Sequence, residues 1–570
     1  MKSILAVALL VASATASLAE PADLVLKNAA VYTLRANKPW ATAVAVTRGV
    51  IVEVGDDKDV AALVGPSTQV VDLNGRMVVP GINDVHVHAL DAAYDARYTC
   101  ALPYTDQLDP VIQAVQACVQ QAQPGEWVLG GPWASALLPQ LGKIETLKRL
   151  DAVSAGHPVV LRDDTYHNRW VNSAVLTEVG IGQGAVSPAG GNIAMDDGQP
   201  TGLLQDFPAW VKVKQATPPR QPDRLRRAVR EAADILSGFG ITGIQDAMVP
   251  REALKAYSEV DRSASGLKLR VVASLDLLGV LGSPDPSLLD DAKDWRTERV
   301  RPDFVKFLID GVPMVYTSLM LEPYLPSHEH GDHYYGAPNF TLPELIERLT
   351  ELDKRGVPVK MHAVGDGAVR LVLDAVQEVR RRNGPNGPRH QIAHLSFVSP
   401  ADYKRFAELN VAADVSPMLW FPHPFTPAIE RTVGHERAWA MLPIASLLKA
   451  GALVAGGSDW PAAQPHANPW VGIEGLVTRR NPEGAVSGVL GPNEGVSLDQ
   501  ALRIYTLNSA AAMGLGTVTG SIEVNKSADM VVLDRDLFKI SPNEIHKTQV
   551  VTTYFQGKKV YEASPTCCAR

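Results

Sequence analysis

The chain has 570 residues, of which 46% are hydrophobic and 20% charged, and its formal net charge at pH 7 is -8. This length is too great for one ordinary domain and is sufficient for a large buried core. The acidic balance excludes the basic surface that would hold nucleic acid or an anionic membrane, so we expect neither as a partner.

Residues 1–19 have the composition of a secretory signal. Lys2 precedes an apolar stretch at residues 4–12, and a run of small residues ends in Ser17-Leu18-Ala19, which fits a cleavage site. The apolar stretch is too short to span a bilayer permanently. We therefore predict a cleaved signal peptide and a periplasmic or secreted protein.

Short alternating runs of apolar and polar residues occupy both ends of the mature chain. They predict short antiparallel strands, because glycine or polar turns separate them. Since two strand-rich ends flank an α/β middle, we predict one composite β-sandwich built from residues 20–80 and 514–563. A short tail would follow at 564–570.

Between these ends, apolar runs that fit buried strands alternate with helical patterns. The strand candidates after the first lie at residues 243–246, 269–274, 304–309, 357–362, 391–395, 411–415 and 453–456. Repeated βα units predict an α/β fold with a parallel sheet, and eight units closed into a (β/α)8 TIM-like barrel would fit residues 81–513. Residues from about 100 to 214 exceed one βα loop, so we predict an insertion after the first barrel strand.

Four cysteines occur in the chain, at Cys100, Cys118, Cys567 and Cys568. Their spacing does not predict a zinc cluster. In an oxidising compartment Cys100 and Cys118 could form a disulfide, but the sequence alone leaves this pairing open.

A His-x-His pair follows the apolar run and Pro80-Gly81 at the start of the predicted barrel. His86 and His88 alternate, so on a strand their side chains point the same way. Two imidazoles that converge at a strand end provide half of a divalent metal site. An isolated His-x-His motif is more often just two polar residues on a half-exposed strand, so its interpretation as a metal site depends on later segments.

Later apolar runs contain or end on further metal-binding residue types, namely Lys306, His362, His394 and Asp459. Burying a lysine inside an apolar run is costly unless its charge is neutralised or paired. A single histidine or aspartate at a strand end usually makes a structural hydrogen bond. Six such residues in barrel order instead predict one site, because ligands gather at the C-terminal ends of barrel strands.

With these segments the chain resembles the metal-dependent amidohydrolase superfamily, and within it the YtcJ-like, N-substituted formamide deformylase-like branch (amidohydrolase family 3). The resemblance runs from about Asp23 to Tyr561. Further segments that support it are His167 with residues 170–173, Asp310-Gly311, Gly365-Asp366, residues 457–461 and residues 506–511. The chain departs from the family at Ala393, where glutamate is frequent, and at Asn525, where glycine is frequent.

The resemblance implies a ligand set. His86 and His88 would bind one divalent metal with Asp459, whereas His362 and His394 would bind a second. A carboxylated Lys306 would bridge the two ions. Nitrogen and carboxylate ligands favour Zn2+, and the sequence leaves open whether one or two ions bind.

Such a site predicts hydrolysis. A metal lowers the pKa of bound water towards about 7, which makes hydroxide available for attack on a carbonyl. Asp459 would take the proton as general base and return it to the leaving amine as general acid. We predict cleavage of a C–N bond, other than a peptide bond, in an amide-like, N-acyl or N-formyl small molecule.

Three alternatives remain. The same site could hydrolyse an ester, lactone or cyclic amide, and deamination is a weaker alternative. A different class is a periplasmic metal-containing binding or regulatory protein without turnover, although the presence of all six ligand candidates argues against it. The sequence also leaves open whether the chain forms a homo-oligomer.

Five residues are candidates for substrate contacts. His167 and Asn172 match a motif of the branch and either close over the site or cap a turn of the insertion. Trp420, Trp460 and Tyr324 fall near predicted strand ends, where they either line an aromatic pocket or pack in the core.

Overall fold

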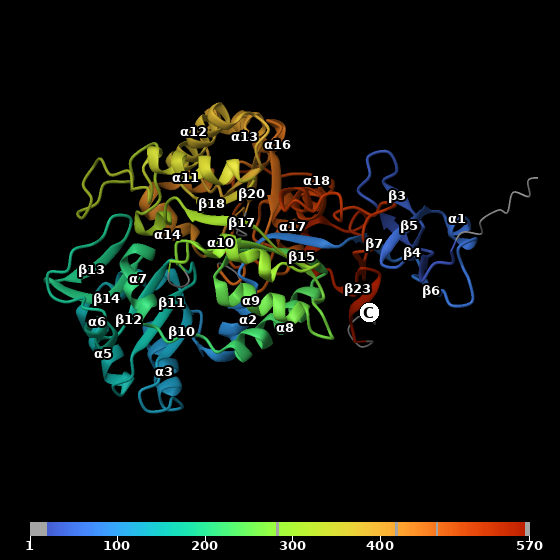
Figure 1. Ribbon diagram of the computed structural model, residues 1–570. Helices are drawn as coiled ribbons and strands as arrows, with labels where there is room; N and C mark the ends of the chain where they lie inside the picture. The colour runs from blue at the N-terminus through green and yellow to red at the C-terminus, as the bar shows by residue number, and fades with distance from the viewer. Residues whose placement is uncertain (1–19, 281–283, 416–419, 463–464, 565–570) are drawn as a thin grey trace, which may run out of the picture.

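The computed structural model describes residues 20–280, 284–415, 420–462 and 465–564 (Figure 1). The predicted signal peptide and almost all of the predicted tail, including Cys567 and Cys568, lie outside the described residues. Among the described residues, no helix has the length and apolar character needed to cross a membrane.

The central element is an eight-stranded parallel sheet that confirms the predicted α/β barrel. In sheet order its strands are β8 (Ile82–Val87), β15 (Ile241–Val249), β16 (Arg270–Leu275), β17 (Val300–Leu308), β18 (Val359–Ala363), β19 (His390–His394), β20 (Val411–Val415) and β21 (Leu453–Gly456). Nearly every residue of these strands is buried, because helices cover the outer face and side chains fill the interior.

The first and last strands of the barrel, β8 and β21, are joined just beyond their ends. The backbone N–H of Asp459 donates to the carbonyl of His86 at 2.7 Å, and that of His88 donates to the carbonyl of Trp460 at 2.9 Å. A Cβ at Gly457 would lie 2.5 Å from the backbone nitrogen of His86, so only glycine permits this approach. This junction of β8 with β21, here called the seam, therefore brings together three predicted metal ligands, His86, His88 and Asp459.

Helices surround the barrel, most of them with one buried apolar face, and α17 is buried almost throughout (Figure 1). They include α2 (Ala89–Tyr98), α8 (Pro222–Gly238), α9 (Arg251–Asp261), α11 (Leu342–Lys354), α12 (Asp366–Asn383), α13 (Tyr403–Glu408), α16 (Ile444–Lys449) and α17 (Pro469–Thr478). Helix α11 begins with a capping box between Thr341 and Glu344, which satisfies N–H groups that the first turn leaves free. Its apolar residues Leu345, Leu349 and Leu352 face the core.

Two sheets at one end of the molecule confirm the predicted composite sandwich (Figure 1). One sheet has the order β5-β4-β1-β6, with bounds Val50–Gly55, Ala43–Thr47, Leu24–Lys27 and Gln69–Asp72. The other has the order β24-β23-β22-β7-β2-β3, with bounds Lys558–Glu562, Val550–Phe555, Met530–Leu533, Met77–Pro80, Ala30–Tyr32 and Trp40–Ala41. Two pairs, β1 with β6 and β2 with β7, are parallel, so the prediction of antiparallel strands was wrong for them. N-terminal β7 pairs with C-terminal β22, so the two ends of the chain share one core.

The predicted insertion forms a separate lobe beside the mouth of the barrel. Its six-stranded sheet has the order β13-β14-β12-β11-β10-β9, with bounds Asn192–Asp196, Gln199–Gln205, Asn168–Val171, Val159–Asp163, Val128–Trp133 and Cys100–Ala101. Helices α3 (Leu108–Val119), α5 (Ile144–Ser154), α6 (Ser173–Glu178) and α7 (Phe207–Ala216) pack against it. A disulfide between Cys100 and Cys118 ties β9 to α3.

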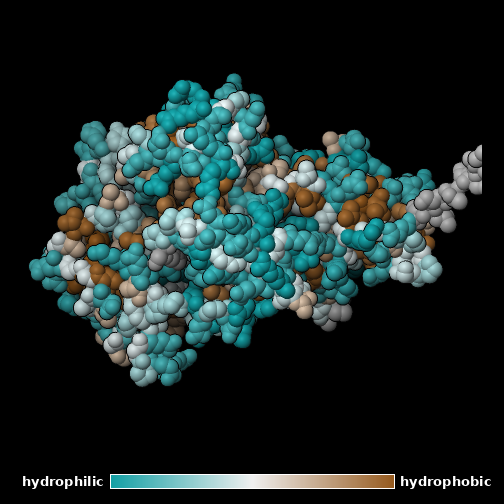
Figure 2. All heavy atoms as spheres, viewed as in Figure 1, coloured by the Kyte–Doolittle hydropathy of each residue, from teal (hydrophilic) through white to brown (hydrophobic). Residues whose placement is uncertain are grey.

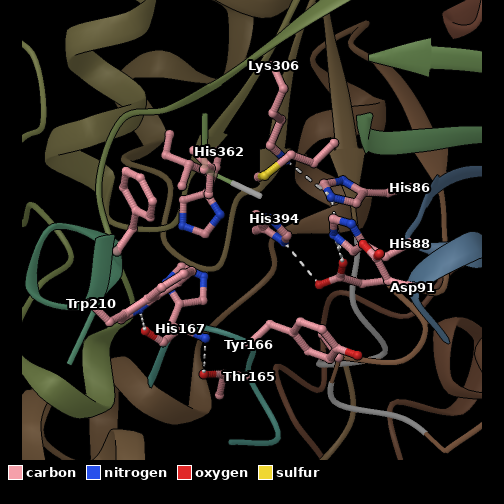
Figure 3. A pocket seen from close by; sticks show the side chains of 16 residues that line it. His86, His88, Asp91, Thr165, Tyr166, His167, Trp210, Lys306, His362 and His394 are labelled. Atoms are coloured by element: carbon pink, nitrogen blue, oxygen red, sulfur yellow. Dashed lines mark hydrogen bonds and ion pairs between the residues drawn. The ribbon is translucent and has the colours of Figure 1, made fainter. Parts of the chain in front are cut away.

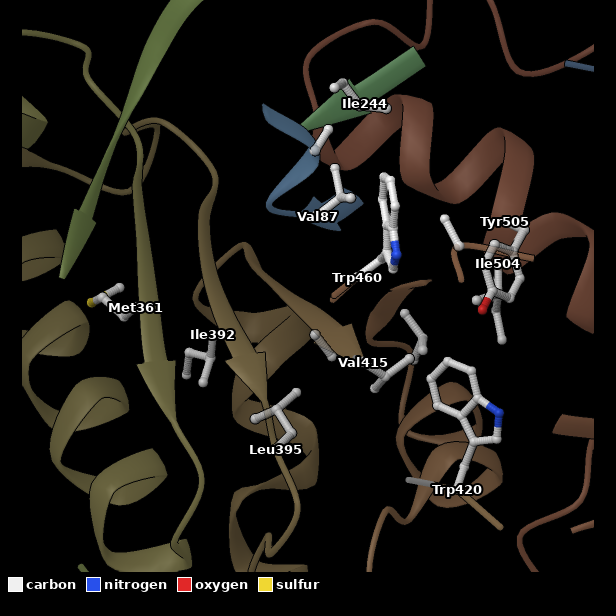
Figure 4. Packing of buried hydrophobic residues seen from close by; sticks show 14 of the residues in the cluster. Val87, Ile244, Met361, Ile392, Leu395, Val415, Trp420, Trp460, Ile504 and Tyr505 are labelled. Carbon is white, nitrogen blue, oxygen red and sulfur yellow. The ribbon is translucent and has the colours of Figure 1, made fainter. Parts of the chain in front are cut away.

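A large apolar core lies around the barrel strands and continues under the surrounding helices and loops (Figure 4). Met361, Ile392 and Val415 come from neighbouring strands, and Trp420 packs with Tyr505 at a ring distance of 6.3 Å. The molecular face in Figure 2 is mostly hydrophilic, with hydrophobic groups scattered over the insertion and the sandwich.

Candidate metal centre

Three side chains from the two sides of the barrel seam converge at its C-terminal end (Figure 3). His86 belongs to β8, His88 follows it, and Asp459 follows β21. Asp459 Oδ1 lies 3.6 Å from Nε2 of His86 and 3.4 Å from Nε2 of His88. Their ligand atoms all lie within 4.8 Å of one another, which is the spacing that one cation can bridge.

The other three predicted ligands reach the same cavity from β17, β18 and β19. Lys306 Nζ lies 3.4 Å from Nε2 of His86. The ring of His394 lies 4.4 Å from that of His362 and 4.7 Å from that of His86, and its Nδ1 is 3.9 Å from Asp459 Oδ2. The barrel thus brings all six residues together, although their roles as ligands stay predictions.

Two of the predicted histidine ligands, His86 and His362, favour the neutral form that binds a metal, whereas His88 would have to release a proton on binding. Burial, and next the charge of Lys306, hold the pKa of His86 well below its usual value. Burial, and next His394, do the same for His362. Burial opposes a charge on His88, but the hydrogen bond with Asp459 raises its pKa. Neutral imidazoles offer a lone pair, so this donor set fits a divalent metal held by nitrogen and carboxylate oxygen.

Lys306 and Asp459 carry the other two functional groups at the bottom of the cavity. Burial, followed by the charge of Lys360, lowers the pKa of Lys306 to about 7. Burial works against ionisation of Asp459, yet the hydrogen bond from His88 and the charge of His394 lower its pKa. Asp459 is therefore an ionised carboxylate, which can accept a proton.

The backbone is left-handed at two of these positions. His394 has φ of +77° and Asp459 has φ of +54°, a region that non-glycine residues seldom adopt. Asp459 is held there by its hydrogen bond to His86 and by the N–H of Ala462, which donates to its carbonyl at 2.7 Å. Such conformations cluster at functional sites because the surrounding structure must compensate for their cost.

A buried ion pair lies behind His86 and was not predicted from the sequence. Nδ1 of His86 is 2.8 Å from Oδ2 of Asp414 on β20. Lys360 on β18 pairs with the same carboxylate and donates to the carbonyl of Val85 at 3.0 Å. This arrangement fixes the imidazole so that Nε2 faces the cavity. In the sequence, Lys360 and Asp414 each place a charge inside an apolar strand run, and this pattern could have indicated the pair.

A second buried carboxylate, Asp310, orders the loop that follows β18. Its oxygens accept hydrogen bonds from the backbone N–H groups of Leu319, Val364 and Gly365, each at 3.0 Å. Burial raises the pKa of Asp310 to about 7. The hydrogen bonds tie this loop to the end of β17, beside His362.

The insertion covers the cavity with residues that sequence reasoning identified only in part. His167, one of the predicted contacts, lies 4.9 Å from the ring of His362, and its Nδ1 is 2.6 Å from Asp206 Oδ1. Trp210 donates to the carbonyl of His167 at 2.8 Å. Tyr166 stacks on His88 with ring centroids 6.3 Å apart and an angle of 8°. No periodic pattern in the sequence predicted Tyr166 and Trp210 at the site, because tertiary contacts fix their positions.

The cavity has a polar wall and an apolar wall. The predicted ligands line a volume of about 70 Å³ together with apolar residues such as Phe207, Met248 and Leu308. A second pocket of about 50 Å³ shares Asp459 and His394 and continues between Val312, Pro313, Met314, Val364, Phe425 and Ile429. The site can therefore hold a small polar group at the histidines with an apolar substituent beside it.

Asn172 does not reach this cavity, which corrects its predicted role in substrate binding. Its side chain is buried at the start of α6, where Oδ1 accepts from the N–H of Val159 at 3.0 Å and from that of Val175 at 3.3 Å. Its amide nitrogen donates to His157 at 2.8 Å. The amide is committed to a helix cap within the insertion, the alternative that the sequence left open.

The three predicted aromatic contacts also lie elsewhere. Trp420 is fully buried and its ring N–H donates to the backbone carbonyl of Gly472 at 3.1 Å. Tyr324 is also buried, and its hydroxyl donates to the backbone carbonyl of Ser318 at 2.8 Å. Trp460 turns away from the ligands and donates to Pro465 at 3.2 Å, where it borders a separate cavity of about 510 Å³. These aromatics follow strand ends in sequence, but their loops direct the rings into packing positions.

Known proteins are similar to this chain in sequence and in fold. The profile of the Amidohydrolase family matches residues 69–561. The N-substituted formamide deformylase of Arthrobacter pascens is 30% identical over 95% of this chain and 98% of its own length. The putative amidohydrolase YtcJ of Bacillus subtilis (strain 168) is 28% identical over 94% of this chain and 98% of its own length. These matches confirm the family and the branch that the sequence resembles.

A solved structure has the same architecture. The uncharacterized metal-dependent hydrolase from Pyrococcus horikoshii OT3 superposes with a TM-score of 0.69 and 23% sequence identity, covering 91% of this chain and 99% of its own. At this identity the likeness is one of fold.

Proposed function

This chain belongs to the amidohydrolase family, and we propose from that premise that it is a metal-dependent hydrolase that cleaves the C–N bond of an N-formyl or N-acyl small molecule. The observation that carries the proposal is the convergence of His86, His88 and Asp459 across the barrel seam, with Lys306 at 3.4 Å from His86. The relative named N-substituted formamide deformylase supports the choice of an N-formyl group.

A divalent metal held by His86, His88 and Asp459 would supply ionised water near neutral pH and polarise the substrate carbonyl. Zn2+ is the ion proposed, because imidazole and carboxylate ligands suit it. We propose that His362 and His394 hold a second ion. A carbamate on Lys306, formed when its neutral amine adds carbon dioxide and releases a proton, would place an oxygen ligand between the two histidine pairs.

The chain's own groups move the proton. Asp459 is ionised and faces the cavity, so it accepts the proton of the attacking water and then delivers it to the amine nitrogen as the C–N bond breaks. His167 stands opposite the barrel ligands and would contact the substrate carbonyl or its substituent. Tyr166 and Trp210 cover the mouth and exclude bulk water.

We also propose that the protein acts in the periplasm or outside the cell. The composition of residues 1–19 and the disulfide between Cys100 and Cys118 support an oxidising compartment. The proposed partner is a small-molecule substrate.

The test combines metal analysis with a substrate screen. Protein purified with added Zn2+ is assayed by elemental analysis, then offered N-formyl amines, N-acetyl amines, and matched esters and lactones. The expected result is one or two ions per chain and release of formate or acetate from an amide, abolished by chelation and restored by Zn2+. Faster cleavage of esters would favour the alternative reaction. A fully loaded protein that hydrolyses none of them would favour a binding role.

A further inference from the structure

A further pocket, distinct from the two that contain predicted ligands, lies beside the metal centre between α2 and the insertion. Its volume is about 130 Å³, and the side chains of Asp91 and Tyr166 line both this pocket and the metal cavity. The lining includes four cationic residues, Arg162, Arg169, Lys214 and Arg220. Two carboxylates, Asp91 and Asp95, line it as well.

Two of the cations are matched by these carboxylates. Arg162 donates from Nε to Asp95 Oδ2 at 2.8 Å, and Arg220 pairs with Asp91. A third carboxylate, the half-exposed Glu252, approaches Arg220 at 3.9 Å from outside. These contacts satisfy Arg162 and Arg220, whereas no carboxylate in the described part of the chain forms an ion pair with Lys214 or Arg169.

Lys214 and Arg169 supply the unmatched charge. The Lys214 ammonium makes no hydrogen bond or ion pair with any residue in the described part of the chain, although it is only partly exposed. Burial, and next the charge of Arg220, lower the pKa of Lys214 to about 8. Among the residues that the structure describes, Arg169 donates to the carbonyls of Tyr166 and Asn168, and its guanidinium stacks over Trp210 at 4.1 Å. The charges of Asp91 and Glu252 act on Lys214, and those of Asp163 and Asp95 on Arg169, without a direct ion pair. Partly buried positive charge with no carboxylate hydrogen-bonded to it is costly, so this pocket favours an anion.

The pocket is separated from the metal centre by one aromatic ring. Tyr166 stacks on the predicted ligand His88 and also lies under the guanidinium of Arg162, at 4.0 Å from its ring centroid. Its hydroxyl donates to Asp95 at 2.8 Å, which holds the ring between the two pockets. Because Asp91 and Tyr166 line both pockets, the two cavities are neighbours. A short molecule that passes beside this ring would present a reacting group to the histidines and a charged end to Lys214.

We propose that this pocket is a carboxylate-binding subsite, and that the substrate carries a carboxylate a few atoms from the bond that is cleaved. The identity of the cleaved bond rests on the proposed function. The negative charge assigned to the substrate rests on the cationic lining of this pocket. Lys214 and Arg169 would bind the carboxylate through charge-assisted hydrogen bonds, with Arg162 at the edge. The apolar pocket beside Met314 and Phe425 lies on the other side of the centre and would take the acyl portion when that portion is larger than formyl.

The test uses a substitution that removes charge and retains the aliphatic stem, Lys214→Met. The matched control is Lys212→Met, because Lys212 lies on the same helix and is exposed. Wild type and both variants are assayed with N-formyl-4-aminobutanoate and with its neutral methyl ester. We expect Lys214→Met to raise KM for the acid about tenfold with little change in kcat, and to leave the ester and the control unaffected.

A binding measurement separates this proposal from the proposed function. Glutarate and inorganic phosphate are titrated calorimetrically at constant ionic strength, which requires no turnover. Glutarate binding that Lys214→Met abolishes supports the subsite even when no amide is hydrolysed. Hydrolysis of neutral formamides with no preference for the acid and no glutarate binding would overturn the subsite alone. Tighter binding of phosphate than of glutarate would overturn the assignment to carboxylates.

Discussion

Nδ1 of His86 lies 2.8 Å from Oδ2 of Asp414, and neither side chain is accessible to solvent. The carboxylate fixes the direction of the imidazole and its tautomer, so that Nε2 presents a lone pair to the cavity. Because Lys360 shares this carboxylate, the three residues form one unit behind the predicted metal ligand.

We expect Asp414→Asn to weaken metal binding by about 10- to 100-fold, because an amide does not hold the His86 tautomer as a carboxylate does. The measurement is a competitive titration of the apoprotein with Zn2+ and a chromophoric chelator. Since this substitution also leaves Lys360 buried without its partner, Lys360→Met/Asp414→Asn is measured in parallel. Unchanged affinity in the folded double variant would remove Asp414 from this positioning role.

Asp459→Asn is expected to retain much of the bound metal, because His86 and His88 remain in place, but to lose about 10²- to 10⁴-fold in kcat. The expected loss follows from the absence of a group that can accept and return the proton. Metal content and kcat are measured on the same preparation. A near-normal rate at full metal occupancy would exclude Asp459 as the general base.

Asn172→Ala is expected to lower the free energy of unfolding by about 2 kcal/mol, since it leaves the N–H groups of Val159 and Val175 without their acceptor. KM should stay the same, because the residue caps a helix and does not line the cavity. Chemical unfolding and steady-state kinetics provide the two measurements. Asn172→Asp keeps the acceptor and loses the donor to the carbonyl of His157, so comparison of the two variants separates these contributions to stability. A raised KM in Asn172→Ala alone would restore a role in substrate binding.

Removal of the disulfide by Cys100→Ala/Cys118→Ala is expected to lower the free energy of unfolding of the insertion by about 3 kcal/mol, because the two residues close a loop with a sequence separation of 18. Thermal unfolding of the variant, and of the wild type with and without reductant, measures this loss. Reductant should lower the melting temperature of the wild type and have no effect on the variant. Equal stability of the reduced and oxidised wild type would contradict the expectation.

The sequence was informative wherever a functional residue follows an apolar strand. His86, Lys306, His362 and Asp459 each break or end a buried run, and the barrel brings such ends together in any chain of this topology. The apolar runs themselves predicted all of the later barrel strands. Asn525 illustrates a tolerated departure from the family, since its φ of +71° is open to asparagine as well as to glycine.

What the sequence could not supply depends on contacts between distant segments. Tyr166 and Trp210 reach the site because the insertion folds back over the barrel, and no periodicity encodes that approach. Trp420 and Tyr324 show the converse, because adjacency to a strand end does not fix the direction of a loop side chain. The pairing of Lys360 with Asp414 was signalled by a charge in each apolar strand, but only the register of β18, β19 and β20 makes them neighbours.

The seam between β8 and β21 has a consequence for metal loading. His86 and His88 lie at the start of the barrel and Gly457 and Asp459 at its end, with the insertion and the other six strands between them. Until β21 docks against β8, the proposed site of the first ion offers only the two nitrogens of His86 and His88, a set that holds an ion weakly. Binding at that site therefore awaits the last strand, so metal loading there reports that the barrel has closed.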